Sequence, residues 1–119
     1  MYPGVDIIEI ERVTQISARY PRFLARLFTE RERALLAPKG PASAAVRFAG
    51  KEAVLKAMGT GLAEGLSWHD VEILEDERRA PVVCLSARAL ALAERRGGKE
   101  VRISLSHDRT HAVAFAVLC

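Results

Sequence analysis

Two carboxylates and two basic residues occupy positions from which they could hold a metal ion and a phosphate. Asp6 stands in the run from Gly4 to Ile10, where a strand would favour an apolar side chain. Glu52 and Lys56 are four residues apart and share one face of a predicted helix, with Arg47 more than one turn before them. Mg²⁺ commonly takes one or two carboxylates and completes its shell with water and phosphate oxygens. The residue types therefore match a Mg²⁺ site for a phosphate-containing substrate.

Each of these residues also has an ordinary structural explanation. Asp6 could cap a neighbouring backbone at the end of its strand. The two helix residues could form a surface ion pair worth under ~1 kcal/mol, and Arg47 could pair with a carboxylate such as Glu64. The turn Gly59-Thr60-Gly61 directly after Lys56 favours the functional interpretation, because small residues let a bulky ligand approach the backbone.

Several other kinds of site are excluded or disfavoured by spacing. Ser106 and His107 are adjacent on a predicted strand and point to opposite faces, so they do not form a nucleophile–base pair. We interpret His107 as a hydrogen-bond donor at a strand end. The chain has no Gly-x-Ser-x-Gly elbow, Walker loop or dinucleotide fingerprint. We interpret His69 and His111 as ordinary polar residues.

The elements that would position these residues follow from hydrophobic periodicity and from capping signals. Strands are predicted over residues 4–10, 71–74, 81–85, 101–106 and 112–118, and helices over 11–20, 23–28, 30–37, 42–58 and 87–96. Thr29 and Glu32 form a capping box, and Ser86 is a second N-cap. Helices early and strands late predict an α+β fold in one domain, residues 1–119, with an antiparallel sheet. The final strand is apolar on both faces, so we expect both faces to be covered, one of them by another subunit.

Charge is concentrated in one segment of the chain. The 119 residues carry a net charge of +3, yet residues 12–29 alone carry +4 because they hold four arginines and no acidic residue. This imbalance indicates an acidic partner, although a solvated helix face with distant counter-charges would have the same composition.

The composition of the whole chain excludes disorder, collagen and coiled coil. The longest apolar run has eight residues, far below the ~20 that cross a bilayer. No signal peptide is visible, and two widely separated cysteines predict reduced thiols in a cytoplasmic protein.

Taken in order, these segments resemble one known family over nearly the whole chain. The matching motifs are Gly4-Val5-Asp6-Ile7-Ile8-Glu9-Ile10, Arg22-Phe23, the helix from Arg47 to Gly61 with its Lys51-Glu52-Ala53-x-x-Lys56 core, and Ile103-Ser104-Leu105-Ser106-His107. The sequence resembles holo-acyl-carrier-protein synthases, the small single-repeat branch of the 4′-phosphopantetheinyl transferases. The resemblance implies that fold, with the sheet packed against one long helix and several short ones. It also implies transfer of 4′-phosphopantetheine from coenzyme A to a serine of apo-acyl carrier protein, releasing 3′,5′-ADP.

The resemblance assigns roles to individual residues. Asp6 and Glu52 would hold Mg²⁺, with Mn²⁺ as the alternative ion, and Lys56 would contact the pyrophosphate, so these three are the expected catalytic residues. The base for the carrier serine would be Glu52 or a metal-bound water. Coenzyme A would be bound by Arg47, Lys56, Gly59, Thr60, Gly61, Ser106 and His107. The acidic carrier would dock on Arg12, Arg19, Arg22, Phe23 and Arg26. A homotrimer with sites at subunit interfaces is implied, with no nucleic-acid or membrane partner.

Two other functions are consistent with parts of the sequence. A small basic module could bind RNA or another polyanion through the same arginines, but seven aromatic residues in the whole chain give it little stacking surface. An inactive subunit could keep the fold for assembly alone, but the presence of both Asp6 and Glu52 argues against it.

Overall fold

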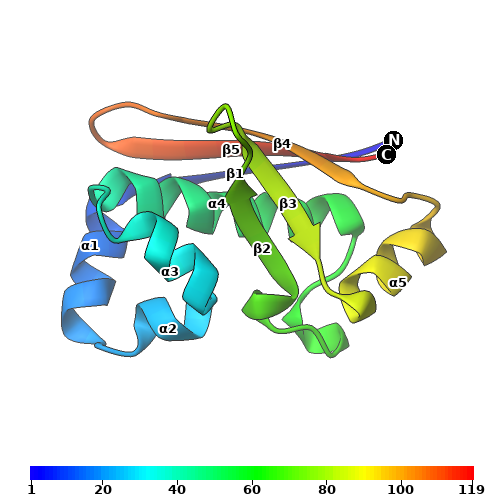
Figure 1. Ribbon diagram of the computed structural model, residues 1–119, viewed down its shortest axis with the longest axis horizontal. Coiled ribbons are helices and arrows are strands. Elements are labelled where there is room, and N and C mark those ends of the chain that lie inside the picture. Colours follow the sequence, from blue (N-terminus) through cyan, green and yellow to red (C-terminus); the bar gives the residue numbers. More distant parts are fainter.

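The structure is a computed structural model that describes residues 1–119, and it has the predicted α+β architecture (Figure 1). Two 3₁₀ turns, η1 (Leu62–Glu64) and η2 (Trp68–Asp70), precede the second strand. The helices are α1 (Ile10–Arg19), α2 (Phe23–Leu27), α3 (Glu30–Leu36), α4 (Pro41–Met58) and α5 (Ala87–Arg96). The strands are β1 (Tyr2–Glu9), β2 (Val71–Glu75), β3 (Pro81–Leu85), β4 (Val101–His107) and β5 (His111–Leu118).

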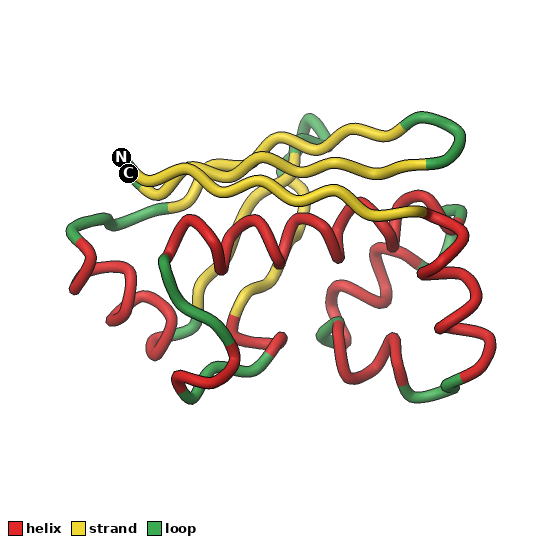
Figure 2. Tube along the Cα trace, turned by 180° about the vertical axis from the view of Figure 1, so that it is seen from behind, coloured by secondary structure: helices red, strands yellow, loops and turns green.

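One antiparallel sheet has the strand order β1-β5-β4, and β2 and β3 form a separate antiparallel hairpin. Helix α4 runs along one face of the three-stranded sheet, as Figure 2 shows from behind. Small residues allow this close approach: a Cβ on Gly4 would collide with the carbonyl oxygen of Ala53. Ala49, Ala53 and Ala57 of α4 are fully buried beneath the sheet. The contact layer of α4 and β1 therefore carries both segments that contain the candidate catalytic residues.

The final strand, β5, has one covered face and one open face in the single chain. Ala112, Ala114, Ala116 and Leu118 face α4 and are buried, as a strand with one covered face requires. On the outer face, Val113 and Phe115 are 36% and 47% exposed, beside Ile7 and Val5 at 65% and 53%. Within the single chain one face of β5 is covered and the other is open, because all the helices lie on one side of the sheet (Figures 1 and 2); cover by another subunit stays a prediction.

A buried ion pair joins the helical lobe α1–α3 to the rest of the molecule. The predicted capping box is present, with Thr29 and Glu32 bonding each other reciprocally. The same Glu32 carboxylate accepts a bond from Lys51 Nζ at 2.7 Å and one from the backbone N–H of Ile73 at 2.8 Å. Lys51 also donates to the carbonyl oxygen of Trp68, and both charged side chains are fully buried. This network fixes α3 against α4 and β2.

The helix ends also follow the sequence. Gly59 ends α4 with φ 67°, and Gly97 ends α5 with φ 102°, both in the left-handed region that favours glycine. Ser86 caps α5 by accepting a bond from the N–H of Ala89. None of the helices combines the length and the apolar character that spanning a membrane would require.

Candidate active site

Asp6, Lys56 and Glu52 come together where the edge strand β1 crosses α4. Asp6 is on the face of β1 that looks toward α4, which explains a polar residue in an otherwise apolar strand. Lys56 Nζ lies 3.1 Å from Asp6 Oδ1 and donates to the carbonyl oxygen of Val5 at 2.9 Å. The Asp6 side chain is 20% exposed and that of Lys56 is 54% exposed, so the pair is open to a ligand.

Burial and the negative charge of the nearby Asp6 affect the pKa of the Glu52 carboxyl. Burial raises the pKa of the Glu52 carboxyl, the nearby charge of Asp6 raises it further, and Lys56 opposes both effects. Two carboxylates and one lysine leave a net charge of −1 in this cluster. A divalent cation would relieve the repulsion between the carboxylates, and two carboxylate ligands fit the needs of Mg²⁺. No group of three or more His, Cys, Asp or Glu residues that could hold a metal ion gathers in the chain.

Arg47 points away from this cluster. Five residues along a helix turn a side chain by about 140° and advance it by about 7.5 Å relative to Glu52. The Arg47 side chain is buried, with Nη2 3.0 Å from Glu75 Oε1 and Nη1 3.5 Å from the carbonyl oxygen of Ser43. The carboxylate that pairs with it is thus Glu75 at the end of β2, and not Glu64.

The other residues expected to bind coenzyme A are spread over two edges of the molecule. Gly59, Thr60 and Gly61 follow Lys56 at the end of α4, where a Cβ on Gly59 would meet the guanidinium of Arg96. Ser106 and His107 are exposed at the end of β4, and β5 separates them from β1. Within one chain the structure therefore gathers Asp6, Glu52 and Lys56 and leaves Arg47, Ser106 and His107 apart from them.

The basic segment forms an unneutralised face on α1 and α2. Arg12, Arg19, Arg22 and Arg26 are exposed, and none of them pairs with a carboxylate. Distant carboxylates of the chain therefore do not pair with these arginines, as the alternative explanation of the basic segment would require. Phe23 is half-buried and packs edge-on against Phe48 with ring centroids 5.9 Å apart. A cavity of about 530 Å³ opens here, lined by Tyr20, Pro21, Arg22, Phe23 and Arg26.

Comparison with known proteins gives one consistent answer. A family model described as the 4′-phosphopantetheinyl transferase superfamily matches residues 2–116. The chain belongs to this superfamily. The holo-[acyl-carrier-protein] synthase of Moorella thermoacetica is 48% identical over 117 residues, which cover 97% of this chain and 91% of that protein.

Two solved structures share the fold. The holo-[acyl-carrier-protein] synthase of Helicobacter pylori in complex with coenzyme A has a TM-score of 0.87 and 31% identity, covering 98% of this chain and 99% of the other. The corresponding synthase of Bacillus anthracis in complex with CoA (3′,5′-ADP) has a TM-score of 0.80 and 35% identity, covering 98% and 94%. The present chain is thus an enzyme of the phosphopantetheinyl transferase class, and the fold expected from sequence is confirmed.

Sequence reasoning missed the partners of two buried cations in this transferase. Lys51 pairs with Glu32 and Arg47 pairs with Glu75, which are 19 and 28 residues away. Glu32 was visible only as a capping residue, and Glu75 lies one residue beyond the predicted strand end. A basic residue that falls among apolar residues on the buried face of a helix needs an acidic partner. Which residue becomes that partner depends on how the β2–β3 hairpin packs.

Proposed function

We propose that this enzyme transfers the 4′-phosphopantetheine group of coenzyme A to a serine of an apo-acyl carrier protein and releases 3′,5′-ADP. The observation that carries the proposal is the convergence of Asp6, Glu52 and Lys56 on an open sheet edge. Relatives over the full chain length that are named holo-[acyl-carrier-protein] synthases, two of them solved in complex with coenzyme A, support the choice of substrates.

Asp6 and Glu52 would hold Mg²⁺, and Mn²⁺ is a possible substitute. When bound, the ion would neutralise charge on the diphosphate oxygens. Lys56 already lies beside both carboxylates, so its ammonium would contact the diphosphate and balance charge on the leaving group. The remaining role of this chain is to hold the donor and the carrier serine in line, which accounts for a large part of catalysis in transfers of this type.

In the chemical step, the serine oxygen bonds to the phosphorus that carries pantetheine, and the bond from that phosphorus to the bridging oxygen breaks. The bridging oxygen leaves as part of 3′,5′-ADP. The serine proton needs an acceptor, and Glu52 lies in the site from which it could be taken. The alternative acceptor is a water molecule held in the same site.

The acidic carrier would dock on Arg12, Arg19, Arg22, Arg26 and Phe23. The guanidinium groups of the four arginines have no carboxylate partner in the chain, so an acidic surface would not have to displace a carboxylate in order to bind them. The cavity between Tyr20 and Arg26 offers an apolar contact next to these charges. Opposite charge would speed the encounter and orient the carrier serine.

The active unit would be a homotrimer with sites between subunits. The uncovered apolar face of β1 and β5 supports contact with other copies of the chain. Arg47, Ser106 and His107 do not reach Asp6 within one chain, so their contribution to one coenzyme A site would come across an interface. Sedimentation near three times 13.1 kDa would agree with this, whereas an active monomer would contradict it.

The direct test is incubation of the protein with coenzyme A, Mg²⁺ and an apo-carrier, followed by mass spectrometry of the carrier. We expect the carrier to gain one phosphopantetheine group and 3′,5′-ADP to appear in equal amount. An unchanged carrier would contradict the proposed reaction. RNA binding without transfer would favour a polyanion-binding module, and inactivity without any binding would favour an assembly subunit.

A further inference from the structure

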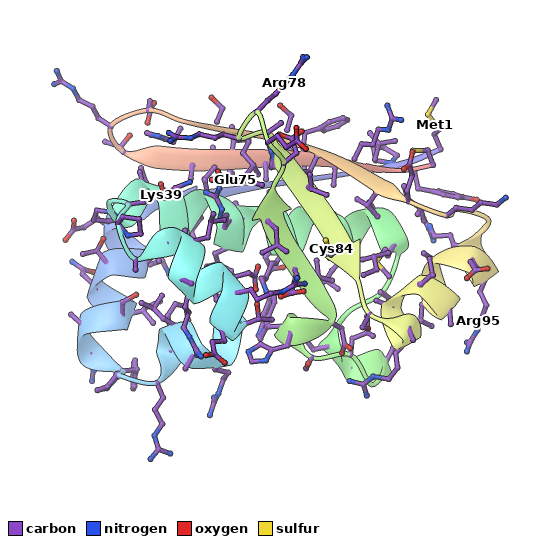
Figure 3. The ribbon with its side chains drawn as sticks, in the orientation of Figure 1. Met1, Lys39, Glu75, Arg78, Cys84 and Arg95 are labelled. Carbon is purple, nitrogen blue, oxygen red and sulfur yellow. The ribbon has the colours of Figure 1, made fainter.

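A second charged cluster surrounds Glu75 on the other side of α4. The Oε1 atom of Glu75 bonds both to Lys39 Nζ and to Arg47 Nη2. The hydrogen bond from Lys39 and the positive charges of Lys39, Arg47 and Arg79 lower the pKa of this carboxyl. Figure 3 shows Lys39 and Glu75 near each other at this edge. Lys39 and Arg47 bond to the Glu75 carboxylate and Arg79 lies near it, so the cluster of three cations and one carboxylate carries a net charge of +2.

Arg47 lacks acceptors in this cluster. Its guanidinium has five N–H donors, but Glu75 is its one close partner and the contact with Ser43 is long at 3.5 Å. The Nε atom is buried without any partner, and the residue as a whole is 6% exposed. Buried polar groups are normally bonded. Arg47 is therefore a buried cation with spare donors, and a phosphate group could supply the missing acceptors.

The cluster opens to a cavity of about 490 Å³. Lys39, Glu75 and Arg79 line this cavity together with Ala34, Leu35 and Pro38. Arg47 does not line it, whereas the carboxylate that Arg47 binds does. An anion that enters the cavity would meet Lys39 and Arg79 at once, but it would reach Arg47 after Glu75 had moved.

We propose that Glu75 is a specificity-determining residue that competes with the donor's 3′-phosphate for Lys39 and Arg47. The inference rests on the proposed use of coenzyme A and on Arg47 as a contact for its phosphoadenosine end. In the free enzyme the Glu75 carboxylate is bonded to Lys39 and Arg47. The 3′-phosphate of the donor must displace this carboxylate in order to bind the same two cations. Glu75 thereby weakens the binding of phosphorylated donors while leaving the reacting diphosphate untouched.

The test compares Glu75→Gln with wild type on two donors, coenzyme A and 3′-dephospho-coenzyme A. Glu77→Gln is the matched control, because it removes the same charge from the same hairpin and Glu77 is exposed without an ion pair. We expect Glu75→Gln to lower the KM for coenzyme A by about two- to fivefold, the worth of one charge contact. The KM for the dephosphorylated donor and both kcat values should stay unchanged. Calorimetric titration with 3′,5′-ADP should show the same gain in affinity.

Three results would overturn the proposal. A higher KM for coenzyme A in Glu75→Gln would mean that Glu75 orients Arg47 for the phosphate. Equal changes with both donors, or no change with either, would mean that the phosphate is not bound at this cluster. If Glu75→Gln does not fold, Glu75→Asp decides, since its shorter side chain should loosen the contact and lower the same KM less strongly. Failure of the proposed function itself is distinct, because wild type would then transfer nothing from coenzyme A.

Discussion

Two charged clusters lie on opposite sides of α4, and their imbalances have opposite signs. Asp6, Glu52 and Lys56 carry a net charge of −1, and burial together with the negative charge of Asp6 raises the pKa of Glu52. Lys39, Arg47 and Arg79 outnumber Glu75, and the hydrogen bond from Lys39 together with these positive charges lowers the pKa of Glu75. One helix thus offers a site that favours a metal cation and another that favours a phosphate. An elongated donor with a diphosphate and a separate phosphate monoester needs both kinds of site, which neighbouring subunits of the proposed trimer would supply together.

The largest effect should come from removing a carboxylate from the negative cluster. Asp6→Asn and Glu52→Gln should each lower kcat/KM by about 10²- to 10⁴-fold, the range typical for loss of a catalytic acid or base. Both side chains lie at the surface of the core, so the fold should survive, and circular dichroism would check it. Activity close to wild type in either variant would remove this cluster from the mechanism.

A balanced cluster on the same helix provides the contrast. Lys51 and Glu32 neutralise each other in full burial, so they should matter for stability and not for ligands. Lys51→Met should lower the free energy of unfolding by about 3–5 kcal/mol, because Glu32 would be left as an unpaired buried charge. Urea unfolding measures this, with Glu30→Gln on the exposed face of α3 as the control. A loss of less than 1 kcal/mol in the free energy of unfolding would show that the Lys51–Glu32 pair does not stabilise the fold in this way.

The arginine face of α1 and α2 is a third imbalance, which we assign to the carrier. Reversal of Arg22 and Arg26 to Glu should raise the KM for the carrier about tenfold or more at low salt and flatten its salt dependence. The KM for coenzyme A should hardly change. Arg95→Glu on α5 reverses an exposed, unpaired charge elsewhere and serves as the control. Equal weakening of both substrates would mean that the face is not a carrier site.

The smallest effect concerns pH and the positive cluster. The pKa of Glu75 is lowered in the folded protein, so its contribution to stability is present above the unfolded value of about 4.3. It is lost as pH falls through the lower folded value. Urea unfolding of wild type and Glu75→Gln from pH 7 to pH 3 would measure it. We expect the advantage of wild type to shrink below about pH 4, and an advantage that persists unchanged would contradict the assigned ion pairs.

Much of the scaffold was predictable because its signals are local. Capping by Thr29 and Ser86 and the helix ends at Gly59 and Gly97 all act within a few residues. The four-residue spacing of Glu52 and Lys56 likewise fixed their common face. These features do not depend on how distant segments pack.

The parts that were missed depend on contacts between distant segments. Arg47 meets Glu75 because the β2–β3 hairpin packs beside α4, and no spacing rule joins residues 28 apart. The outer face of β5 has the apolar character of a covered surface, but a sequence does not say whether the cover lies in the same chain. A resemblance to a family can place residues such as Arg47 near a ligand without revealing which carboxylate holds them beforehand.

The most direct test of the central claim is the metal dependence of transfer at the negative cluster. Apo-carrier and coenzyme A would be incubated with chelator-treated protein over a series of Mg²⁺ concentrations, and the modified carrier would be counted by mass spectrometry. We predict no transfer without a divalent ion, recovery as Mg²⁺ is added, and a shift of this recovery to higher Mg²⁺ in Asp6→Asn. Transfer at the full rate in the absence of any divalent ion would contradict the account.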